Sequence, residues 1–314
     1  MVVYTVLAGM LSIVALDLFN GLLITGGVFL AAPLALKAAG GWSGLTQALP
    51  AEHFTIFGSL GVVPALGLFL PTFFLLLGES SMYQKFMSAF DERSARRAVI
   101  GMIAGVVLIE TILNATAVFG AGIYQGDPAL GNGETIILQL ARYDLPAAAG
   151  VVLLAGAVAI IFSTANTFLM IPSTNLTRDV FQRFLRPDAS PSTLIWFQRG
   201  SIVVLAVISF IVSSFFESIL DMALYAYTMV GAAVTPALLA AFLWRRVTPA
   251  GGTVSIAAGM LVTVGFAVSN AVGLTQWDYN YIIYPAGAAS ILCLIVVSLA
   301  TPASPEAKWR PFWS

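Results

Sequence analysis

Charged residues are scarce in this sequence, and their scarcity sets the class of protein. Asp, Glu, Lys and Arg make up 9% of its 314 residues, whereas hydrophobic residues make up 59%. Soluble domains carry roughly 25% charged residues, so a soluble globular protein is excluded. The mean hydropathy of +0.93 agrees with a polytopic all-α membrane protein. We therefore expect the chain to be embedded in a lipid bilayer. The net charge of −1 gives no reason to expect a nucleic-acid partner.

Histidine and cysteine are almost absent as well. The sequence contains one of each, His53 and Cys293. A tetrahedral metal site needs several such ligands and a disulfide needs two cysteines, so neither is expected. The sequence also lacks a GxxxxGK[ST] phosphate-binding loop, which leaves ATP-driven transport without support. No Ser/His/Asp or Cys/His set can be assembled within the membrane, so we expect no enzyme.

Long apolar runs, by contrast, are plentiful. A helix that crosses a hydrocarbon core of about 30 Å needs roughly 17–25 apolar residues. Residues 1–15 are apolar but too short to cross before Asp17, so they fit the remnant of a longer helix or an interfacial segment. We expect one transmembrane domain over residues 1–314, with about eight spans. These lie near 17–37, 56–78, 98–123, 146–174, 194–216, 219–244, 251–273 and 281–300.

Lys and Arg alternate between the two sides of the expected membrane. The chain has 14 of them, and only Lys37 and Arg142 fall on one set of loops, while the rest fall on the other set and the ends. Because cytoplasmic loops carry an excess of Lys and Arg, the basic side is expected to be cytoplasmic. We therefore predict a multi-pass protein of the plasma membrane with both termini in the cytoplasm.

Two connecting segments are expected to be helical without crossing the membrane. The stretch ETIILQLARY, within residues 124–145, follows Gly, Pro and Asn turn signals and predicts a short helix on the external membrane surface. The stretch ESSMYQKFMSAFDERSARRAV is amphipathic and basic, which predicts a solvated helix at the cytoplasmic interface.

An adjacent hydroxyl pair, Ser163 and Thr164, interrupts the apolar span near 146–174. The pair stands in a run of polar residues that continues to Asp179, so this part of the helix should face protein or a cavity. The two side chains are about 100° apart on a helix, and Ile160 lies one turn before Ser163. Two hydroxyls and a backbone carbonyl could therefore converge on one small cation. Alternatively, both hydroxyls bond to carbonyls of their own helix and need no ligand.

The span near 56–78 contains helix-disrupting residues. Gly58, Gly61 and Gly67 interrupt its apolar pattern, and Pro64 and Pro71 each remove a backbone donor. Spans interrupted in this way often form discontinuous helices that line a substrate cavity. A kinked or closely packed helix is the alternative, because Gly and Pro are common in membrane spans.

Two acidic residues fall within or beside spans. Glu110, with Asn114 one turn later, lies at bilayer depth, where a charge costs at least ~2.5–3.5 kcal/mol and should find an interior partner. It could bind a cation or an amine, relay a proton, or remain protonated and bond a neighbouring helix. Asp17, with Asn20, stands at the start of the first full span, where an Asp favours a helix N-terminus.

At this point a family resemblance becomes evident. FSTANTFLMIPSTNLTRDVFQRFL resembles the most characteristic stretch of the sodium:solute symporter family, which includes sodium/proline, sodium/pantothenate and sodium/glucose cotransporters. YTVLAGMLSIVALDLFNGLL, with Ala8-Gly9, Leu16-Asp17 and Asn20 as variants, is similar to another family stretch. Gln84-Lys85 and the segment LYAYTMVGAAVTPALLAAFLWRRVTPAGG resemble two more. The matches keep their order over essentially the whole chain.

The resemblance implies a leucine-transporter-like fold of two inverted five-helix repeats. Residues 1–16 would be the remnant of a truncated helix, 17–37 the last helix of the first repeat, and 56–244 the second repeat. Residues 251–300 would be peripheral helices, and 301–314 a cytoplasmic tail.

The resemblance also implies functional residues. The family's sodium site carries over to Ile160, Ser163 and Thr164, and Asp17 corresponds to an Asp near the cytoplasmic sodium exit. The inner part of the interrupted span would contact substrate or form a gate. It contains Phe69, Thr72, Phe73 and Phe74.

One departure from the family is large, because the earlier helices of the first repeat are missing. Those helices supply the other sodium carbonyls, and a hard cation gives up its water only for several protein oxygens. We therefore expect an incomplete C-terminal part of a symporter, whose partner could be the missing helices as a separate chain.

The expected function is sodium-coupled secondary transport of a small organic solute by alternating access, with Na⁺ as the coupling ion. Two alternatives remain open. One is a proton-coupled transporter of the same fold that uses Glu110, and the other is a non-transporting membrane scaffold or partner subunit.

Overall fold

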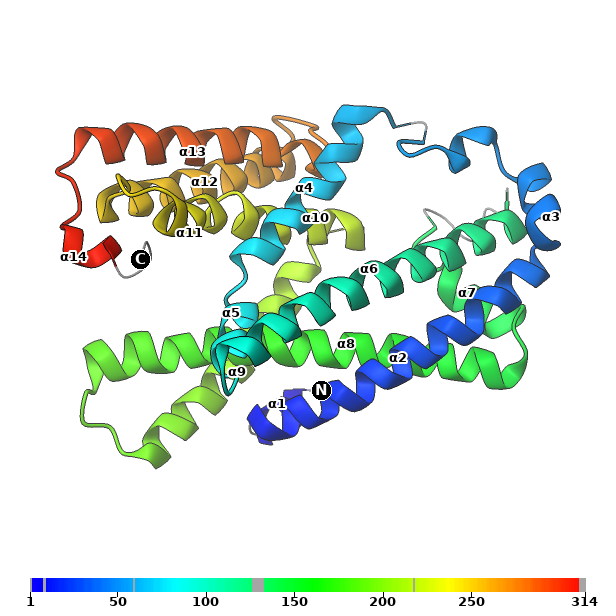
Figure 1. Ribbon diagram of the computed structural model, residues 1–314, viewed down its shortest axis with the longest axis horizontal. Helices are drawn as coiled ribbons and strands as arrows, with labels where there is room; N and C mark the ends of the chain where they lie inside the picture. The colour runs from blue at the N-terminus through cyan, green and yellow to red at the C-terminus, as the bar shows by residue number, and fades with distance from the viewer. Residues whose placement is uncertain (1, 8–9, 59, 126–132, 217, 311–314) are drawn as a thin grey trace. The chain divides into compact units, whose positions relative to one another are not determined.

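A computed structural model gives the structure of the chain and describes residues 2–7, 10–58, 60–125, 133–216 and 218–310 (Figure 1). All regular secondary structure in these ranges is helical. Eight of the described helical segments are long and apolar enough to cross a membrane, which confirms a multi-pass all-α membrane protein. They are Leu16–Ala38, Val62–Tyr83, Glu92–Ile123, Ala147–Leu185, Pro191–Ser213, Ile219–Leu243, Pro249–Ala271 and Tyr279–Ala300. The variant pair Ala8-Gly9 lies outside the described residues, as do the side chains of Gln84, Lys85 and Lys308.

The chain forms two compact units and passes between them three times. The first unit comprises residues 1–55 and 85–212, and the second comprises 56–84 and 213–314. The first contains α1 (Val2–Leu7), α2 (Met10–Ala38), α3 (Gly41–Ala48), α6 (Glu92–Ile123), α7 (Ile136–Tyr143), α8 (Ala147–Asn175) and α9 (Pro191–Ser213). The second contains α4 (Val62–Gly78), α10 (Ile219–Gly231), α11 (Val234–Leu243), α12 (Pro249–Ala271), α13 (Ile283–Ala300) and α14 (Glu306–Trp309). The short α5 (Ser80–Met87) lies where the chain passes from the second unit to the first.

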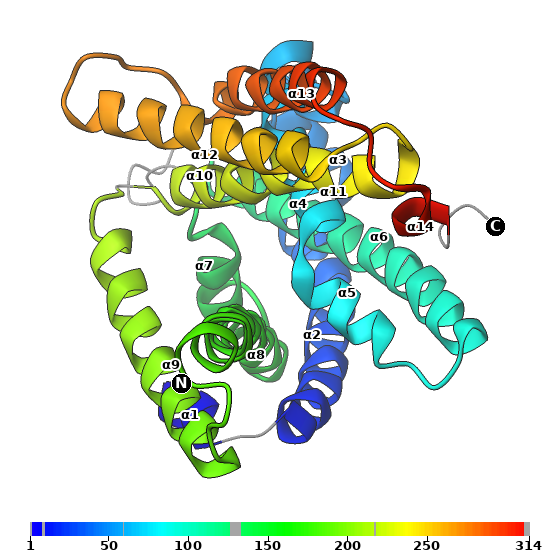
Figure 2. The same ribbon diagram turned by 90° about the vertical axis from the view of Figure 1, so that its left-hand side faces the viewer.

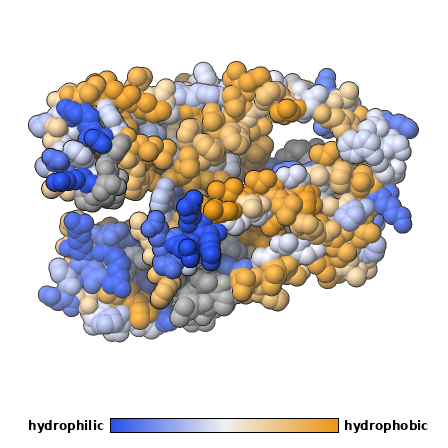
Figure 3. Space-filling view, viewed as in Figure 1, coloured by the Kyte–Doolittle hydropathy of each residue, from blue (hydrophilic) through white to orange (hydrophobic). Residues whose placement is uncertain are grey.

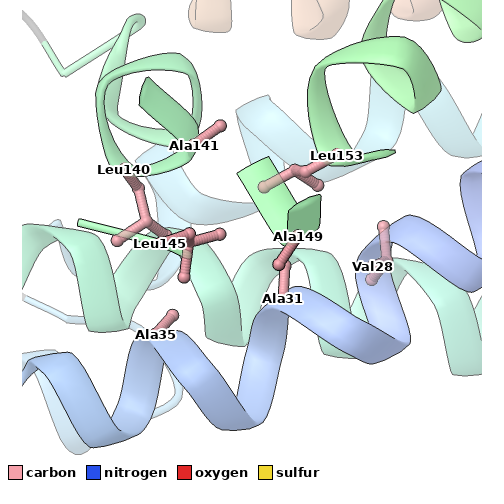
Figure 4. Close-up of a cluster of buried hydrophobic side chains, with 8 residues drawn as sticks. All are labelled: Val28, Ala31, Ala35, Leu140, Ala141, Leu145, Ala149 and Leu153. Atoms are coloured by element: carbon pink, nitrogen blue, oxygen red, sulfur yellow. The ribbon is translucent and has the colours of Figure 1, made fainter. Parts of the chain in front are cut away.

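The core of the first unit lies where α2, α7 and α8 meet. Figure 4 shows its eight buried side chains, which are mostly small: Val28, Ala31, Ala35, Leu140, Ala141, Leu145, Ala149 and Leu153. Small residues let helix backbones approach closely, which is how membrane helices gain packing contacts without a hydrophobic driving force. Gly150 is the extreme case, since a Cβ atom at this position would lie 2.0 Å from the carbonyl oxygen of Ala141.

The exposed surface of the helices agrees with a lipid environment. Figure 3 shows hydrophobic side chains over most of one face, with hydrophilic side chains gathered in a few patches. Large apolar side chains such as Leu22, Val107 and Phe210 are more than half exposed, although a soluble protein would bury many of them. In a bilayer these side chains meet acyl chains.

The two connecting segments are helical, with one difference from the prediction. The stretch ETIILQLARY forms α7, whose Leu140 and Ala141 are buried in the core. The amphipathic stretch is not one helix but two, because α5 ends at Met87 and α6 begins at Glu92. Asp91 caps α6 by accepting a hydrogen bond from the Ser94 backbone N–H at 2.7 Å. Hydrogen bonds from the Ser94 side chain and backbone lower the pKa of Asp91.

The interrupted span is a continuous helix, α4, in place of a discontinuous one. Gly58 and Gly61 have positive φ angles of 57° and 75° and precede the helix. Pro64 falls in the first turn, where a missing backbone donor has no helical partner in any case. Pro71 is accommodated within the helix. Gly67 instead allows close packing, since a Cβ atom there would lie 2.2 Å from the carbonyl oxygen of Asn280.

A break occurs instead in the span predicted over residues 219–244. Its helix divides into α10 and α11 at a turn over Ala232 and Ala233. Pro236 explains the position, because a proline ring clashes with the carbonyl four residues earlier and offers that carbonyl no donor. Gly259 of α12 packs on the turn, where a Cβ atom would lie 2.7 Å from the Cα atom of Ala233.

In the second unit, α12 and α13 run side by side (Figure 2) and are joined by hydroxyl pairs. Ser255 and Ser290 lie 2.8 Å apart between their Oγ atoms, and Thr248 and Thr301 lie 2.7 Å apart between their Oγ1 atoms. Arg246 adds a third connection to α13, because its guanidinium donates to the carbonyl oxygens at the end of that helix. The acceptors are Ser298 at 2.6 Å, Leu299 at 3.2 Å and Thr301 at 2.8 Å.

We expect Arg246→Gln to loosen the end of α13, because the last carbonyls of a helix have no partner within it. A hydrogen bond to a charged group contributes about 1.5–3 kcal/mol, so local amide exchange should accelerate at least tenfold. Hydrogen–deuterium exchange of residues 296–304 measures the effect. Arg245→Gln is the matched control, since Arg245 contacts the ring of Trp309. Equal exchange in the two variants would contradict this role of Arg246.

Candidate functional site

Two residues singled out from the sequence, Ser163 of α8 and Asp17 of α2, meet in the structure. The Ser163 hydroxyl donates to Oδ1 of Asp17 across 2.6 Å, although 146 positions separate the two residues in sequence. Both side chains are partly buried, and both belong to the first unit. The close approach follows from small residues, since a Cβ atom at Gly27 of α2 would lie 3.1 Å from the carbonyl oxygen of Val152 in α8.

The partner of Ser163 distinguishes it from the other hydroxyls of the same helix. Ser173 and Thr174 both donate to the carbonyl of Met170, and Thr177 donates to that of Ser173. These bonds stay within the helix, as expected of Ser and Thr in an apolar span. Ser163 instead donates to another helix, so the alternative of a self-satisfied hydroxyl does not describe it.

Thr164 and Ile160 lie on the same part of α8 but face differently. Thr164 is exposed, and the side chain of Ile160 is 38% exposed. The helix therefore presents Ser163 toward α2 and Thr164 away from it, about 100° round the axis. Of the three predicted sodium ligands, Ser163 alone forms a side-chain hydrogen bond to another helix within the described part of the chain.

Buried polar residues extend the Asp17–Ser163 contact along both helices. The Thr5 hydroxyl of α1 donates to Oδ1 of Asn166, and both residues are fully buried. Asn20, one turn after Asp17, is 6% exposed. The amide nitrogens of Asn20 and Asn166 have no hydrogen-bond partner among the described residues. A buried unpaired donor costs about 1–3 kcal/mol, so a further acceptor next to either nitrogen would be stabilising.

A groove of about 400 Å³ runs between α2 and α8 beside this contact. Asn20 contributes its only polar side chain, and the rest of the lining is apolar: Leu16, Leu23, Ala155, Val158, Ala159 and Phe162. The sequence singles out Asn20 and a polar run that includes Asn166, but not Thr5, which lies in the short apolar segment before Asp17. A hydroxyl within that apolar stretch was the available signal.

The predicted gate residues divide into two sets on α4, in the second unit. Phe69, Thr72 and Phe73 are exposed, and the rings of Phe69 and Phe73 stack with their centroids 5.5 Å apart. Phe74 is partly buried: its ring meets that of Phe73 edge to face, with the centroids 5.6 Å apart, and it packs on a buried cluster that includes Ala232 and Ile283. The Phe74 carbonyl accepts a hydrogen bond from Thr235 at 2.6 Å. A role for Phe69, Thr72, Phe73 and Phe74 in solute binding stays a prediction.

Glu110 and Asn114 lie on α6, and both are exposed. Among the described residues, Glu110 has no hydrogen bond or ion pair of the kind expected for a carboxylate at this depth. The roles considered for Glu110 stay predictions.

The chemistry of the site is that of hard oxygen donors. No group of three His, Cys, Asp or Glu residues that could hold a metal ion occurs among the described residues. The polar atoms at the α2–α8 contact are a carboxylate, hydroxyls and side-chain amides, which suit an alkali or alkaline-earth cation better than a transition metal.

Comparisons with known proteins identify the family. The model of the sodium:solute symporter family matches residues 1–259. The chain belongs to the sodium:solute symporter family. This match confirms the resemblance found in the sequence, and it makes the chain a member of a family of membrane transport proteins.

Relatives of this symporter-family chain are named for proline transport. It is 26% identical over 324 residues to the "High-affinity proline transporter PutP" of Bacillus subtilis, covering 99% of the chain and 66% of the relative. It is 28% identical over 230 residues to the "Sodium/proline symporter" of Haemophilus influenzae, covering 71% of the chain and 45% of the relative. The protein of that name in Salmonella typhimurium is 26% identical over 325 residues, covering 99% and 62%. The chain thus spans between 45% and 66% of the length of these relatives.

Proposed function

We propose that this chain takes part in sodium-coupled uptake of a small organic solute by alternating access across the plasma membrane. The observation that carries the proposal is the hydrogen bond from Ser163 to Asp17 between α2 and α8. It joins a residue of the expected sodium site to the residue of the expected sodium exit. In this proposal both termini lie in the cytoplasm and Na⁺ is the coupling ion.

The mechanism follows from the chemistry of these oxygens. Na⁺ would bind to the Ser163 and Thr164 hydroxyls and the Ile160 carbonyl, and Asp17 would receive it as it leaves toward the cytoplasm. The hydrogen bond to Asp17 is compatible with this role, since a Ser163 hydroxyl that donates to Asp17 keeps a lone pair for a cation. Moving one charge across 100 mV is worth about 2.3 kcal/mol, or roughly 50-fold accumulation of solute.

Three oxygens from one helix are too few for a hard cation. We propose that the remaining ligands come from a part of the symporter that this chain does not contain, on the same polypeptide or a separate one. The unpaired amide nitrogens of Asn20 and Asn166 support a further polar segment near this contact. Proline is the first solute to test, because the relatives are named for it.

Uptake of radiolabelled proline into cells that express the chain together with the rest of the symporter, measured against external sodium concentration, tests the proposal. We expect Ser163→Ala and Thr164→Ala to raise the sodium concentration for half-maximal uptake by severalfold, because each removes a cation ligand. Ser201→Ala is the matched control, since the Ser201 hydroxyl donates at 2.9 Å to Phe197 of its own helix.

Three outcomes would contradict the proposal. Unchanged sodium dependence of uptake in both variants would show that the sodium site is not on α8. Uptake that does not depend on the sodium concentration but is lost in Glu110→Gln would indicate proton coupling. A chain that neither takes up nor binds a solute, yet purifies with a second membrane polypeptide, would indicate a partner subunit without transport activity of its own.

A further inference from the structure

The second unit contains a groove at membrane depth, independent of the sodium site. It measures about 570 Å³ and is lined by α4, α10, α11 and α13 and the turn between α10 and α11. These helices belong to segments that are long and apolar enough to cross a membrane. The volume is within the range of about 300–1,000 Å³ that is typical of small-molecule sites.

The side chains that line this groove favour a hydrocarbon ligand. Every lining side chain is apolar except those of Tyr284 and Trp244. The Tyr284 hydroxyl already donates to the carbonyl of Val63 at 2.6 Å. A polar solute would therefore lose its bonds to water and gain few in return, which costs free energy for each group left unpaired.

The groove is elongated along α13. Its lining residues on this helix follow the helical repeat and so share one face: Ile283, Tyr284, Gly287, Ala288, Ile291, Leu294 and Ile295. With a rise of 1.5 Å per residue, the twelve steps from Ile283 to Ile295 cover about 18 Å. That length is more than half of the hydrocarbon core of about 30 Å. An extended alkyl chain fits this shape better than a compact ligand does.

One end of the groove carries aromatic and basic groups suited to a headgroup. Trp244 lines that end, and the next residue, Arg245, is exposed. The Arg245 guanidinium lies 5.3 Å from the ring centroid of Trp309. Arg246 donates to Ser298 near the end of α13, which places this Trp-Arg-Arg sequence at the end of the groove opposite Tyr284. Tryptophan is enriched at the membrane interface, and each basic residue near the surface attracts anionic lipid by about 1 kcal/mol.

We propose that this groove binds one acyl chain of an anionic phospholipid, with the phosphate of its headgroup at Arg245. The lipid would hold α13 against α4 and the α10–α11 turn, because all three line the groove. Gly287 is the key position in the lining, because a Cβ atom there would meet no other atom within 4 Å and would point into open space. A larger side chain at Gly287 can therefore occupy the groove without a clash.

Native mass spectrometry of the chain tests the proposal after reconstitution in vesicles of equal parts phosphatidylglycerol and phosphatidylcholine. We expect about one phosphatidylglycerol to remain on each chain after extraction with mild detergent. Gly287→Leu should lose the lipid, whereas Gly265→Leu should retain it. Gly265 is the matched control, because it lies in α12, outside the groove, and its Cβ would also meet nothing within 4 Å.

Further variants separate the acyl chain from the headgroup. Arg245→Gln should keep a lipid but lose the preference for phosphatidylglycerol over phosphatidylcholine. If Gly287→Leu fails to fold, Ala288→Phe fills the same groove from a neighbouring, exposed position. Equal lipid retention in the filled variants and in Gly265→Leu would overturn the proposal, as would a polypeptide in place of the lipid.

Discussion

Gly150→Ala is expected to destabilise the chain by about 1–3 kcal/mol, although alanine is the better helix former. The added methyl group would lie 2.0 Å from the carbonyl oxygen of Ala141, which is far inside the van der Waals contact distance of two non-bonded atoms. Because the obstacle is the backbone of α7, a rotamer change cannot relieve it, and α7 must move away from α8. The midpoint of unfolding of the purified protein in detergent measures the loss.

The matched control for this substitution is Gly26→Ala on α2. A Cβ atom at Gly26 would meet nothing within 4 Å. That variant should be unchanged or more stable by up to about 1 kcal/mol, since only helix propensity differs. Opposite signs for the two variants are the expected result. Shifts of the same sign and size would show that α7 and α8 are not packed as closely as the structure has them.

Asp17→Asn is expected to raise the sodium concentration for half-maximal uptake at least tenfold, which corresponds to about 1.4 kcal/mol. The substitution keeps the shape of the side chain and removes its charge, so packing between α2 and α8 should survive. If Asp17 and Ser163 act on one ion, Ser163→Ala should add little in the Asp17→Asn background. A double-mutant cycle measures this coupling, for which about 0.5–3 kcal/mol is typical of residues in contact.

Asp91→Asn is the control for loss of a carboxylate. Asp91 caps α6 outside the membrane span, and asparagine caps helices about as well. Its sodium dependence should match that of the unmodified chain. Strict additivity of Asp17→Asn and Ser163→Ala would contradict a shared ion and leave their hydrogen bond as a packing contact between helices.

The spans could be predicted from the sequence because hydropathy and length decide them. All eight expected spans have a counterpart, and most ends agree within a few residues. The helix α4 begins at Val62 and not at residue 56 as expected, because Gly58 and Gly61 favour a turn more than their apolar neighbours favour a helix. The turn at Ala232 and Ala233 was missed because two alanines carry no turn signal. Only the clash of Pro236 with the preceding backbone places it there.

The site could be predicted in part. The hydroxyl pair and Asp17 were identified separately, from polarity and from the family resemblance, but no pattern in the sequence shows that Ser163 reaches Asp17. The pairing depends on how closely α2 and α8 approach at Gly27, which is a tertiary property. Thr5 was missed for the same reason, since its partner Asn166 stands 161 positions away.

The helix that carries Ser163 continues beyond the end of α8. From Ala147 to Leu185 it forms one segment of 39 residues, whose last part, Leu176–Leu185, is a π-helix. The 29 residues of α8 alone extend about 43 Å, which exceeds the hydrocarbon core of about 30 Å. Asn175 lies twelve residues, or about 18 Å, beyond Ser163. A tilt of about 10° with Ser163 held in place would therefore displace the end of α8 by about 3 Å, so a small rearrangement at the proposed ion site would become a movement at the end of this helix.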